Sequence, residues 1–204
     1  MSERSAASAV ARVAFAVTLA FSSARGAHAE PSDAEAQASA RRVLIALRVL
    51  AYDKALEERT PDEVATVVLL ARNADASHVA RARWQAGFAL LPKVKVGGRP
   101  VRVVAIDFEG ARSLDNLVAA LAPTAMIVMS DLAADVPAIR AASRAHHVLT
   151  IADREELVRA GLAVGLVAGH EHDEIVIDVD AARAEGVRFG AGLLQLARIV
   201  GAGK

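Results

Sequence analysis

The sequence predicts an α/β protein: a three-layer sandwich with a mostly parallel sheet, helices on both faces, and a C-terminal antiparallel hairpin followed by a helix. Three observations lead to this prediction. Short apolar runs alternate with helical patterns four times along the chain, which is typical of parallel strands joined by right-handed crossovers. The runs at residues 64–70 and 125–129 are apolar almost throughout, as in strands covered on both faces. Two last apolar runs, residues 163–168 and 175–179, flank a short polar turn, as in a hairpin.

Residues 1–29 have the pattern of an export signal. Basic residues precede the apolar residues 13–21, and the small residues Ala27 and Ala29 frame a cleavage site. The apolar segment is short for a membrane-spanning helix, which needs about 20 residues. We therefore prefer a signal peptide cleaved after Ala29 to an uncleaved anchor. The prediction is a periplasmic domain of residues 30–204, with no membrane span in the mature chain.

The elements of this domain follow from hydrophobic period and from helix breakers. A helix begins at residues 31–33 and carries an apolar stripe that ends near Tyr52, since proline is tolerated in a first turn. Residues 72–77 are expected to form a polar loop, and residues 93–96 a short edge segment. Apolar runs between turn residues predict strands at residues 64–70, 101–106, 125–129, 148–151, 163–168 and 175–179. Helical spacing predicts further helices at residues 79–91, 114–121, 131–144 with a break at Pro137, 153–160, and from Arg188 through Val200.

Composition limits the classes of function. Hydrophobic residues make up 54% of the chain and aromatic residues only 3%, so the core is expected to be aliphatic, with Trp84 as its one large ring system. The formal net charge is +0, which removes the strong basic field of a nucleic-acid-binding protein. The chain has no cysteine, which excludes disulfides, thiol chemistry and cysteine-ligated metals.

Motifs of catalysis are missing from the sequence. There is no phosphate-binding loop, no dinucleotide-binding glycine fingerprint and no nucleophile elbow, so we predict neither enzyme activity nor a cofactor. Acidic residues follow several of the predicted strands, and we interpret them as helix caps and solvated loop residues. His170 and His172 lie in the polar turn of the hairpin. A metal-dependent hydrolase built on these two histidines is our third hypothesis, and we assign no metal site to them.

A second hypothesis is a small-molecule-binding domain. Open α/β sheets bind ligands at the carboxyl ends of their strands. Arg72 and Asn73 follow the first predicted strand, and Ser130 and Asp131 follow the third. These four residues are the candidates for a ligand site at the strand ends.

The order of several stretches resembles the YfiR-like family of periplasmic regulators. These are the turn Gly98-Arg99-Pro100 before a strand, VLTIADREELVRAGLAVGLV at residues 148–167, and IVIDVDAARAEGVRFGAGLLQLA at residues 175–197. The resemblance implies a non-enzymatic protein that binds and restrains a membrane-embedded signalling partner, typically a diguanylate cyclase, in cyclic-di-GMP signalling. The chain departs from the family in having no cysteine, so the redox control of disulfide-bearing members cannot operate here.

The leading hypothesis is therefore a regulator that docks on a periplasmic domain. The expected partner is the periplasmic domain of an inner-membrane sensor kinase or diguanylate cyclase, with a homodimer as a further option. The end of the first helix is the expected contact region, although Tyr52 and its neighbours replace an aromatic-rich segment that is frequent in the family. Tyr52, Arg99 and Arg188 are the candidate partner surface.

Overall fold

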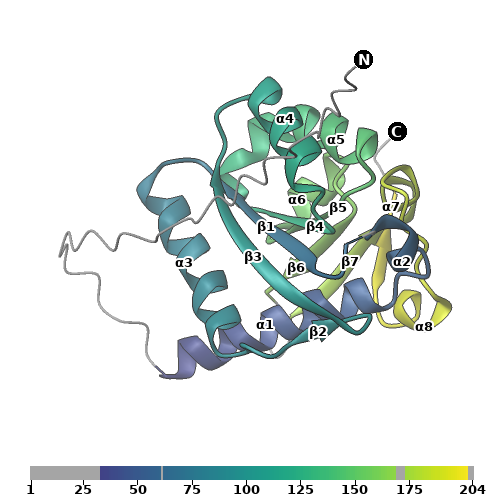
Figure 1. The fold of residues 1–204 in the computed structure, drawn as a ribbon, viewed down its shortest axis with the longest axis horizontal. Helices are drawn as coiled ribbons and strands as arrows, with labels where there is room; N and C mark the ends of the chain where they lie inside the picture. The colour runs from purple at the N-terminus through teal and green to yellow at the C-terminus, as the bar shows by residue number, and fades with distance from the viewer. Residues whose placement is uncertain (1–32, 61, 169–172, 202–204) are drawn as a thin grey trace, which may run out of the picture. The chain divides into compact units, whose positions relative to one another are not determined.

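The computed structural model describes residues 33–60, 62–168 and 173–201. The described residues contain the strands β1 (Ala65–Ala71), β2 (Lys95–Val96), β3 (Arg99–Asp107), β4 (Ala125–Val128), β5 (Leu149–Ala152), β6 (Val164–Val167), β7 (Glu174–Asp178) and β8 (Arg198–Val200). They form one sheet in the order β2-β3-β1-β4-β5-β6-β7-β8 (Figure 1). The strands from β3 to β6 in this order are parallel, β2 and β7 are antiparallel to β3 and β6, and β8 runs parallel to β7. The predicted α/β fold, with its mostly parallel sheet and C-terminal antiparallel hairpin, is confirmed.

Helices cover both faces of this sheet (Figure 1). One face packs against α1 (Asp33–Ala51), α2 (Leu56–Arg59), α3 (Asp75–Ala89), α7 (Val179–Ala184) and α8 (Ala191–Leu194). The opposite face packs against α4 (Ala111–Leu121), α5 (Val136–Ala145) and α6 (Glu155–Arg159), with the 3-10 helix η1 (Ser130–Asp135) leading into α5 near Pro137, where a break was predicted. Of the helices in the described ranges, none is long and apolar enough to cross a membrane.

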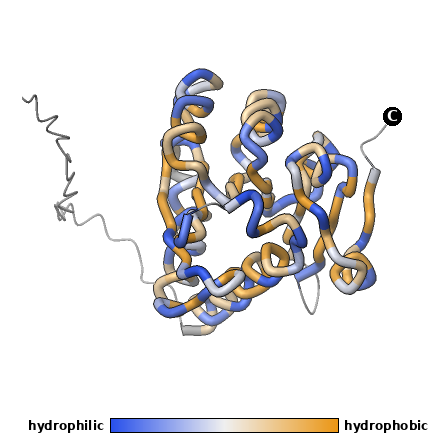
Figure 2. Tube along the Cα trace, turned by 45° about the vertical axis from the view of Figure 1, so that its right-hand side comes forward, coloured by the Kyte–Doolittle hydropathy of each residue, from blue (hydrophilic) through white to orange (hydrophobic). Residues whose placement is uncertain are grey.

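The alternation of side chains along β1 builds two cores. Val67 and Leu69 pack with α1 and α3, whereas Val68 and Leu70 pack with α4 and α5. All of β1 is buried, because paired strands and helices cover it on every side. Figure 2 shows hydrophobic and hydrophilic residues alternating along the helices that surround the sheet. Trp84 is only 4% exposed and belongs to the α1–α3 core, as the composition predicted.

Two boundary predictions are wrong. Helix α3 begins at Asp75, inside the segment expected to be a loop. The last predicted helix ends at Leu194, and residues 198–200 form β8 instead. The open edge of β7 has backbone groups that need partners, and β8 supplies them. Arg198 also ties β8 to the sheet through Glu174, with Nε 2.7 Å from Oε1.

A buried ion pair lies at the amino ends of the parallel strands. Asp53 precedes α2 and Arg59 is its last residue, with Arg59 Nη2 2.7 Å from Asp53 Oδ2. Arg59 Nη1 donates to the backbone oxygens of Thr124 at 3.2 Å and His147 at 2.8 Å. Since these two residues precede β4 and β5, one guanidinium joins the α1–α2 connection to the start of both strands.

A second buried carboxylate, Glu185, lies near the same end of the sheet. It accepts hydrogen bonds from the Thr150 backbone N–H at 2.8 Å, from the Thr150 hydroxyl at 2.7 Å and from the Ser143 hydroxyl at 2.9 Å. No cation forms an ion pair with it among the described residues. Burial therefore raises the pKa of Glu185 from 4.5 to about 7, and the hydrogen bonds from Thr150 and Ser143 offset only part of this effect.

Candidate functional site

Two of the three candidate partner residues are brought together by the fold. The Tyr52 carbonyl accepts the backbone N–H of Gly190 at 3.1 Å, and the backbone N–H of Arg188 donates to Asp53 Oδ1 at 2.8 Å. The Arg188 side chain then reaches α2, with Nη2 2.5 Å from Glu58 Oε1. The end of α1, α2 and the segment before α8 thus form one region of the molecule.

Arg99 lies at the other side of α2. Its Nε donates to the backbone oxygen of Asp62 at 3.1 Å, and its Nη1 lies near Gly97 in the turn between β2 and β3. That turn packs against Leu56 of α2, because a Cβ placed on Gly97 would come within 2.9 Å of Leu56 Cδ2. Helix α2 therefore separates Arg99 from the pair formed by Tyr52 and Arg188.

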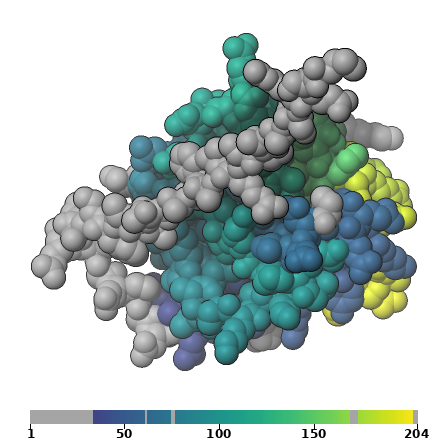
Figure 3. Space-filling view, in the orientation of Figure 1, coloured from purple at the N-terminus to yellow at the C-terminus, as the bar shows by residue number. Residues whose placement is uncertain are grey.

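Large apolar side chains are exposed at Tyr52 and in the segment that follows α8. The Tyr52 ring lies against α8, where a Cβ on Gly192 would be 3.6 Å from its Cε1. Tyr52 is 42% exposed, Leu196 just after α8 is 71% exposed, and Ile199 of β8 is 49% exposed. We call Tyr52, Arg188, Leu196 and Ile199 the C-terminal surface. Figure 3 shows the α2 region, in blue, adjoining the C-terminal segment, in yellow.

The four residues predicted for a ligand site lie at a topological switch point. The chain leaves β1 through α3 on one face and leaves β3 through α4 on the other, so the strand order reverses between β1 and β4. Ligands of open α/β sheets bind at such points. Arg72 and Asn73 follow β1 here, and Ser130 and Asp131 follow β4 as expected.

These side chains are, however, engaged with neighbouring protein groups. Asp131 Oδ2 accepts the backbone N–H of Arg72 at 3.0 Å and also the hydroxyl of Ser77. The Arg72 guanidinium pairs with Asp135. Asn73 Oδ1 lies 2.9 Å from His78 Nε2. The bonds therefore fasten the start of α3 to η1, and in this set the Oδ1 of Asp131 is buried without a hydrogen-bond partner among the described residues.

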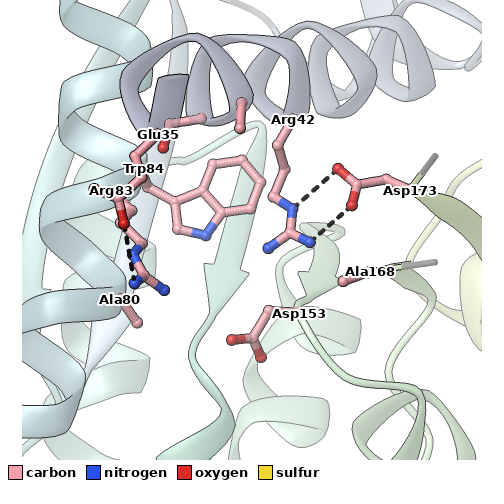
Figure 4. Close-up of a pocket in the computed structure, with 10 residues that line it drawn as sticks. Glu35, Arg42, Ala80, Arg83, Trp84, Asp153, Ala168 and Asp173 are labelled. Atoms are coloured by element: carbon pink, nitrogen blue, oxygen red, sulfur yellow. Dashed lines mark hydrogen bonds and ion pairs between the residues drawn. The ribbon is translucent and has the colours of Figure 1, made fainter. Parts of the chain in front are cut away.

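A cavity of about 470 Å³ lies beside the switch point, between α1 and α3 and over the carboxyl ends of β5 and β6. Its volume falls within the range of about 300–1,000 Å³ that is usual for small-molecule sites. Figure 4 shows that its polar side chains come from both helices and from the strand ends. Its walls include Ser39 and Arg42 of α1, Arg83 and Trp84 of α3, and Asp153 and Asp173 at the strand ends.

Arg42 is held in place at the cavity wall. Its Nε lies 3.2 Å from Asp173 Oδ2, and its Nη2 lies 2.9 Å from Asp173 Oδ1. This two-point contact fixes the plane of the guanidinium. Figure 4 shows the group between Trp84 and Asp173 and above Asp153, with its third nitrogen on the side away from Asp173.

Asp153 is the most unusual polar group in the cavity. It follows β5 directly, and its Oδ1 is buried without a hydrogen-bond partner among the described residues. Burial raises its pKa, while the positive charges of Arg154 and Arg42 act in the opposite direction. A buried polar atom without a partner is rare in folded proteins and calls for an explanation.

The part of the chain that the structure describes contains no candidate metal site. Within that part, no group of three His, Asp or Glu side chains is arranged to hold a metal ion. His170 and His172, the pair considered for a metal-dependent hydrolase, lie outside the described residues.

Sequence reasoning missed most of this cavity. Asp153 was visible as an acidic residue after a strand, but the pattern favoured a helix cap. Arg42 and Trp84 lie on the inward sides of two helices that are far apart in sequence, and only the packing of α1 on α3 brings them to Asp153. One available signal was Arg42 itself, a charged residue beside the apolar stripe of the first helix.

Comparison with known proteins gives one family and several similar folds. The family described as YfiR/HmsC-like matches residues 56–198. The comparison with curated proteins gave no match. Among solved structures, an ABC domain in complex with L-Trp from Streptococcus pneumoniae is 14% identical with a TM-score of 0.53, and the match covers 74% of this chain and 60% of that chain.

Two further solved structures are similar at the same level. A conserved domain protein from Vibrio cholerae O1 biovar El Tor is 11% identical with a TM-score of 0.54, covering 79% of this chain and 59% of that one. A substrate-binding protein with adhesive properties from Clostridium difficile, in a ligand-free, open structure, is 13% identical with a TM-score of 0.51, covering 74% and 58%. The chain thus spans about three fifths of the length of these proteins, and identities this low show a shared fold alone.

Proposed function

This chain belongs to the YfiR/HmsC-like family, and we propose that it is a periplasmic, non-enzymatic regulator that binds and restrains a membrane-embedded signalling partner. The partner class is a diguanylate cyclase or sensor kinase of the inner membrane with a periplasmic domain. The observation that carries the proposal is the family match over residues 56–198. That range contains Arg99 and Arg188, whereas Tyr52 lies before it.

The C-terminal surface is the docking region in this proposal. Tyr52, Leu196 and Ile199 supply exposed apolar area, and Arg188 supplies a charge held over α2 by Glu58. Aromatic and arginine side chains contribute disproportionately to protein interfaces. Restraint would follow from binding one state of the partner more tightly than the other, since only differential affinity shifts such an equilibrium.

Crosslinking in cells tests the docking region directly. A photo-crosslinking phenylalanine analogue placed at Tyr52 should capture an integral membrane protein that carries a cyclase or kinase domain. The same analogue at Val79, an exposed apolar residue on α3, serves as the matched control and should capture none. Capture only of a second copy of the chain would favour the homodimer, and equal capture from both positions would contradict the docking region.

The restraining role has its own test. Deletion of the gene should raise the output of the partner, measured as cellular cyclic-di-GMP for a cyclase. The wild-type gene should restore the low level, and a Leu196→Ser variant should restore it less well than a Val79→Ser variant. An unchanged level after deletion would contradict restraint of a cyclase.

Export is part of the same proposal. We expect removal of residues 1–29 and a mature domain that begins at Glu30. The mass of the protein recovered from the periplasmic fraction tests the cleavage after Ala29. Recovery of the uncleaved chain from the membrane fraction would favour an anchor.

A further inference from the structure

The cavity between α1 and α3 is lined by hydrogen-bonding groups of opposite kinds. The carboxylate of Asp153 belongs to the lining, and its Oδ1 has no hydrogen-bond partner among the described residues. Arg42 donates hydrogen bonds to Asp173 through its Nε and Nη2. Its Nη1 makes no hydrogen bond among the described residues. The indole nitrogen of Trp84 likewise makes none there, and Figure 4 shows it on the side of the ring that faces Arg42 and Asp153.

The charges of the wall are nearly balanced. Arg42 is paired with Asp173 at 2.9 Å, and Arg83 lies 3.9 Å from Glu35. Asp153 is the remaining carboxylate of the lining, and no ion pair joins it to a cation among the described residues. A ligand that fills this space therefore needs a positive group for Asp153 and an acceptor for the two free donors.

We propose that this cavity binds a small zwitterion of the α-amino-acid class. The ligand ammonium contacts Asp153, and its carboxylate accepts from Arg42 Nη1 and the Trp84 indole N–H. The ligand side chain lies along the indole ring and the small residue Ala80. The proposal does not depend on the regulatory function, and it gives such a regulator a route by which a metabolite changes its state.

Simpler ligands fit the same groups less well. An anion without an ammonium would bring its charge towards the uncompensated Asp153. A cation without a carboxylate would leave the Arg42 and Trp84 donors facing it without acceptors, and unmatched polar groups in a closed site lower affinity. An ammonium at Asp153 would also stabilise the ionised carboxylate, which burial otherwise disfavours.

A thermal-shift screen with matched analogues tests the ligand class. The purified protein is heated with each of the twenty L-amino acids at millimolar concentration, and we expect at least one to raise Tm by a few degrees, because a ligand selective for the folded state stabilises it. The best binder is then compared with its counterparts that lack one charged group. For leucine these are isoamylamine and 4-methylpentanoate, and each should bind at least about tenfold more weakly, since it loses one charged hydrogen-bonding contact.

Variants tie the binding to this cavity. Asp153→Asn should weaken the amino acid at least about tenfold by calorimetry, because the amide carries no charge for the ammonium. Trp84→Phe keeps a ring and removes the N–H, and should weaken binding less. Asp180→Asn makes the same chemical change at an exposed carboxylate of α7 and should leave the affinity unchanged.

Each contrary result overturns the proposal. Absence of binding by all twenty amino acids would exclude the ligand class. Equal affinity for the amine would indicate a simple cation site, and equal affinity for the acid would indicate an anion site. Unchanged affinity in Asp153→Asn, with Tm near that of the unaltered protein, would place the binding elsewhere in the molecule.

Discussion

Two aspartates at opposite ends of the parallel strands, Asp53 and Asp153, differ in how their carboxylate oxygens are bonded. At the amino end, Asp53 accepts bonds from Arg59 and from the backbone N–H groups of Ala55 and Arg188, so both of its oxygens are occupied. At the carboxyl end, Asp153 leaves one buried oxygen without a partner among the described residues. The first arrangement joins segments of the chain to one another, and the second leaves an oxygen without a partner in a residue that lines a cavity.

We expect this difference to assign different roles to the two ends of the sheet, folding stability at one end and ligand binding at the other. A charge pair closed off from water is expensive to break, because the remaining charge keeps its burial and loses its partner. An unmatched carboxylate contributes little to the folded state, and such groups concentrate at functional sites. The amino end is therefore expected to govern the free energy of unfolding, and the carboxyl end to govern ligand affinity.

The largest effect is expected from Arg59→Met. The substitution keeps much of the side-chain volume but leaves Asp53 buried without its cation and leaves the carbonyls of Thr124 and His147 without their donor. Loss of one partner of a buried ion pair typically costs about 3–5 kcal/mol. Urea unfolding at neutral pH measures this loss.

The matched control is Arg183→Met, which removes an exposed arginine near Asp180. Exposed pairs contribute about 0–1 kcal/mol, so the control should unfold close to the unaltered protein. Similar losses in both variants would contradict the role assigned to the amino end.

The next effect is a dependence on pH at Glu185. The pKa of this carboxyl is raised from 4.5 to about 7 in the folded state, so between these pH values the unfolded chain releases the proton first. Stability from this group is complete below pH 4.5 and falls by about 1.4 kcal/mol per pH unit up to about pH 7. Urea unfolding across this range should show the slope in the wild type and a flatter profile in Glu185→Gln. Parallel profiles would mean that Glu185 does not titrate as described.

A smaller effect is expected from Asp153→Asn in the absence of ligand. Burial raises the pKa of Asp153, so the ionised form is disfavoured by folding and its replacement removes an unfavourable term. The free energy of unfolding at pH 7 should rise, by no more than about 1 kcal/mol. A loss as large as that of Arg59→Met would show that the carboxyl end is also a stability element and would remove the contrast.

The smallest effect on stability is expected from Arg188→Ala. The side chain pairs with Glu58 at an exposed position, and the backbone N–H that Asp53 uses remains in the variant. The change should stay below about 1 kcal/mol in a thermal melt. A well-folded Arg188→Ala protein is then a fair test of partner docking, whereas a large drop in Tm would make Arg188 part of the amino-end network.

The sequence predicts strands well because their burial leaves a direct mark on composition. Continuous apolar runs such as residues 64–70 and 125–129 correspond to strands covered on both faces. The last residues were misplaced because Leu193 through Val200 fit a helical stripe, while the open edge of β7 selects a strand. That choice is made by tertiary structure, which single-sequence periodicity does not contain.

The cavity is harder to predict for the same reason. Arg42, Trp84 and Asp153 are separated by long stretches of chain, and each has an ordinary local interpretation as surface charge, core ring or helix cap. Arg59 and Asp53 are close in sequence, but their burial depends on Thr124 and His147. Ion pairs and cavities of this kind depend on how helices lie across the sheet, and hydrophobic patterns fix only which faces are covered.

Gly87 of α3 determines how close α1 and α3 can come. A Cβ at this position would lie 2.6 Å from the backbone oxygen of Ser39 and 2.9 Å from Val43 Cγ2, so the helices touch only because a methyl group is missing. Ser39 also belongs to the cavity wall. An alanine here would force the two backbones apart and enlarge the space beside Trp84 without altering any charged group. Gly87 therefore sets the width of the cavity although it is not one of the residues that line it.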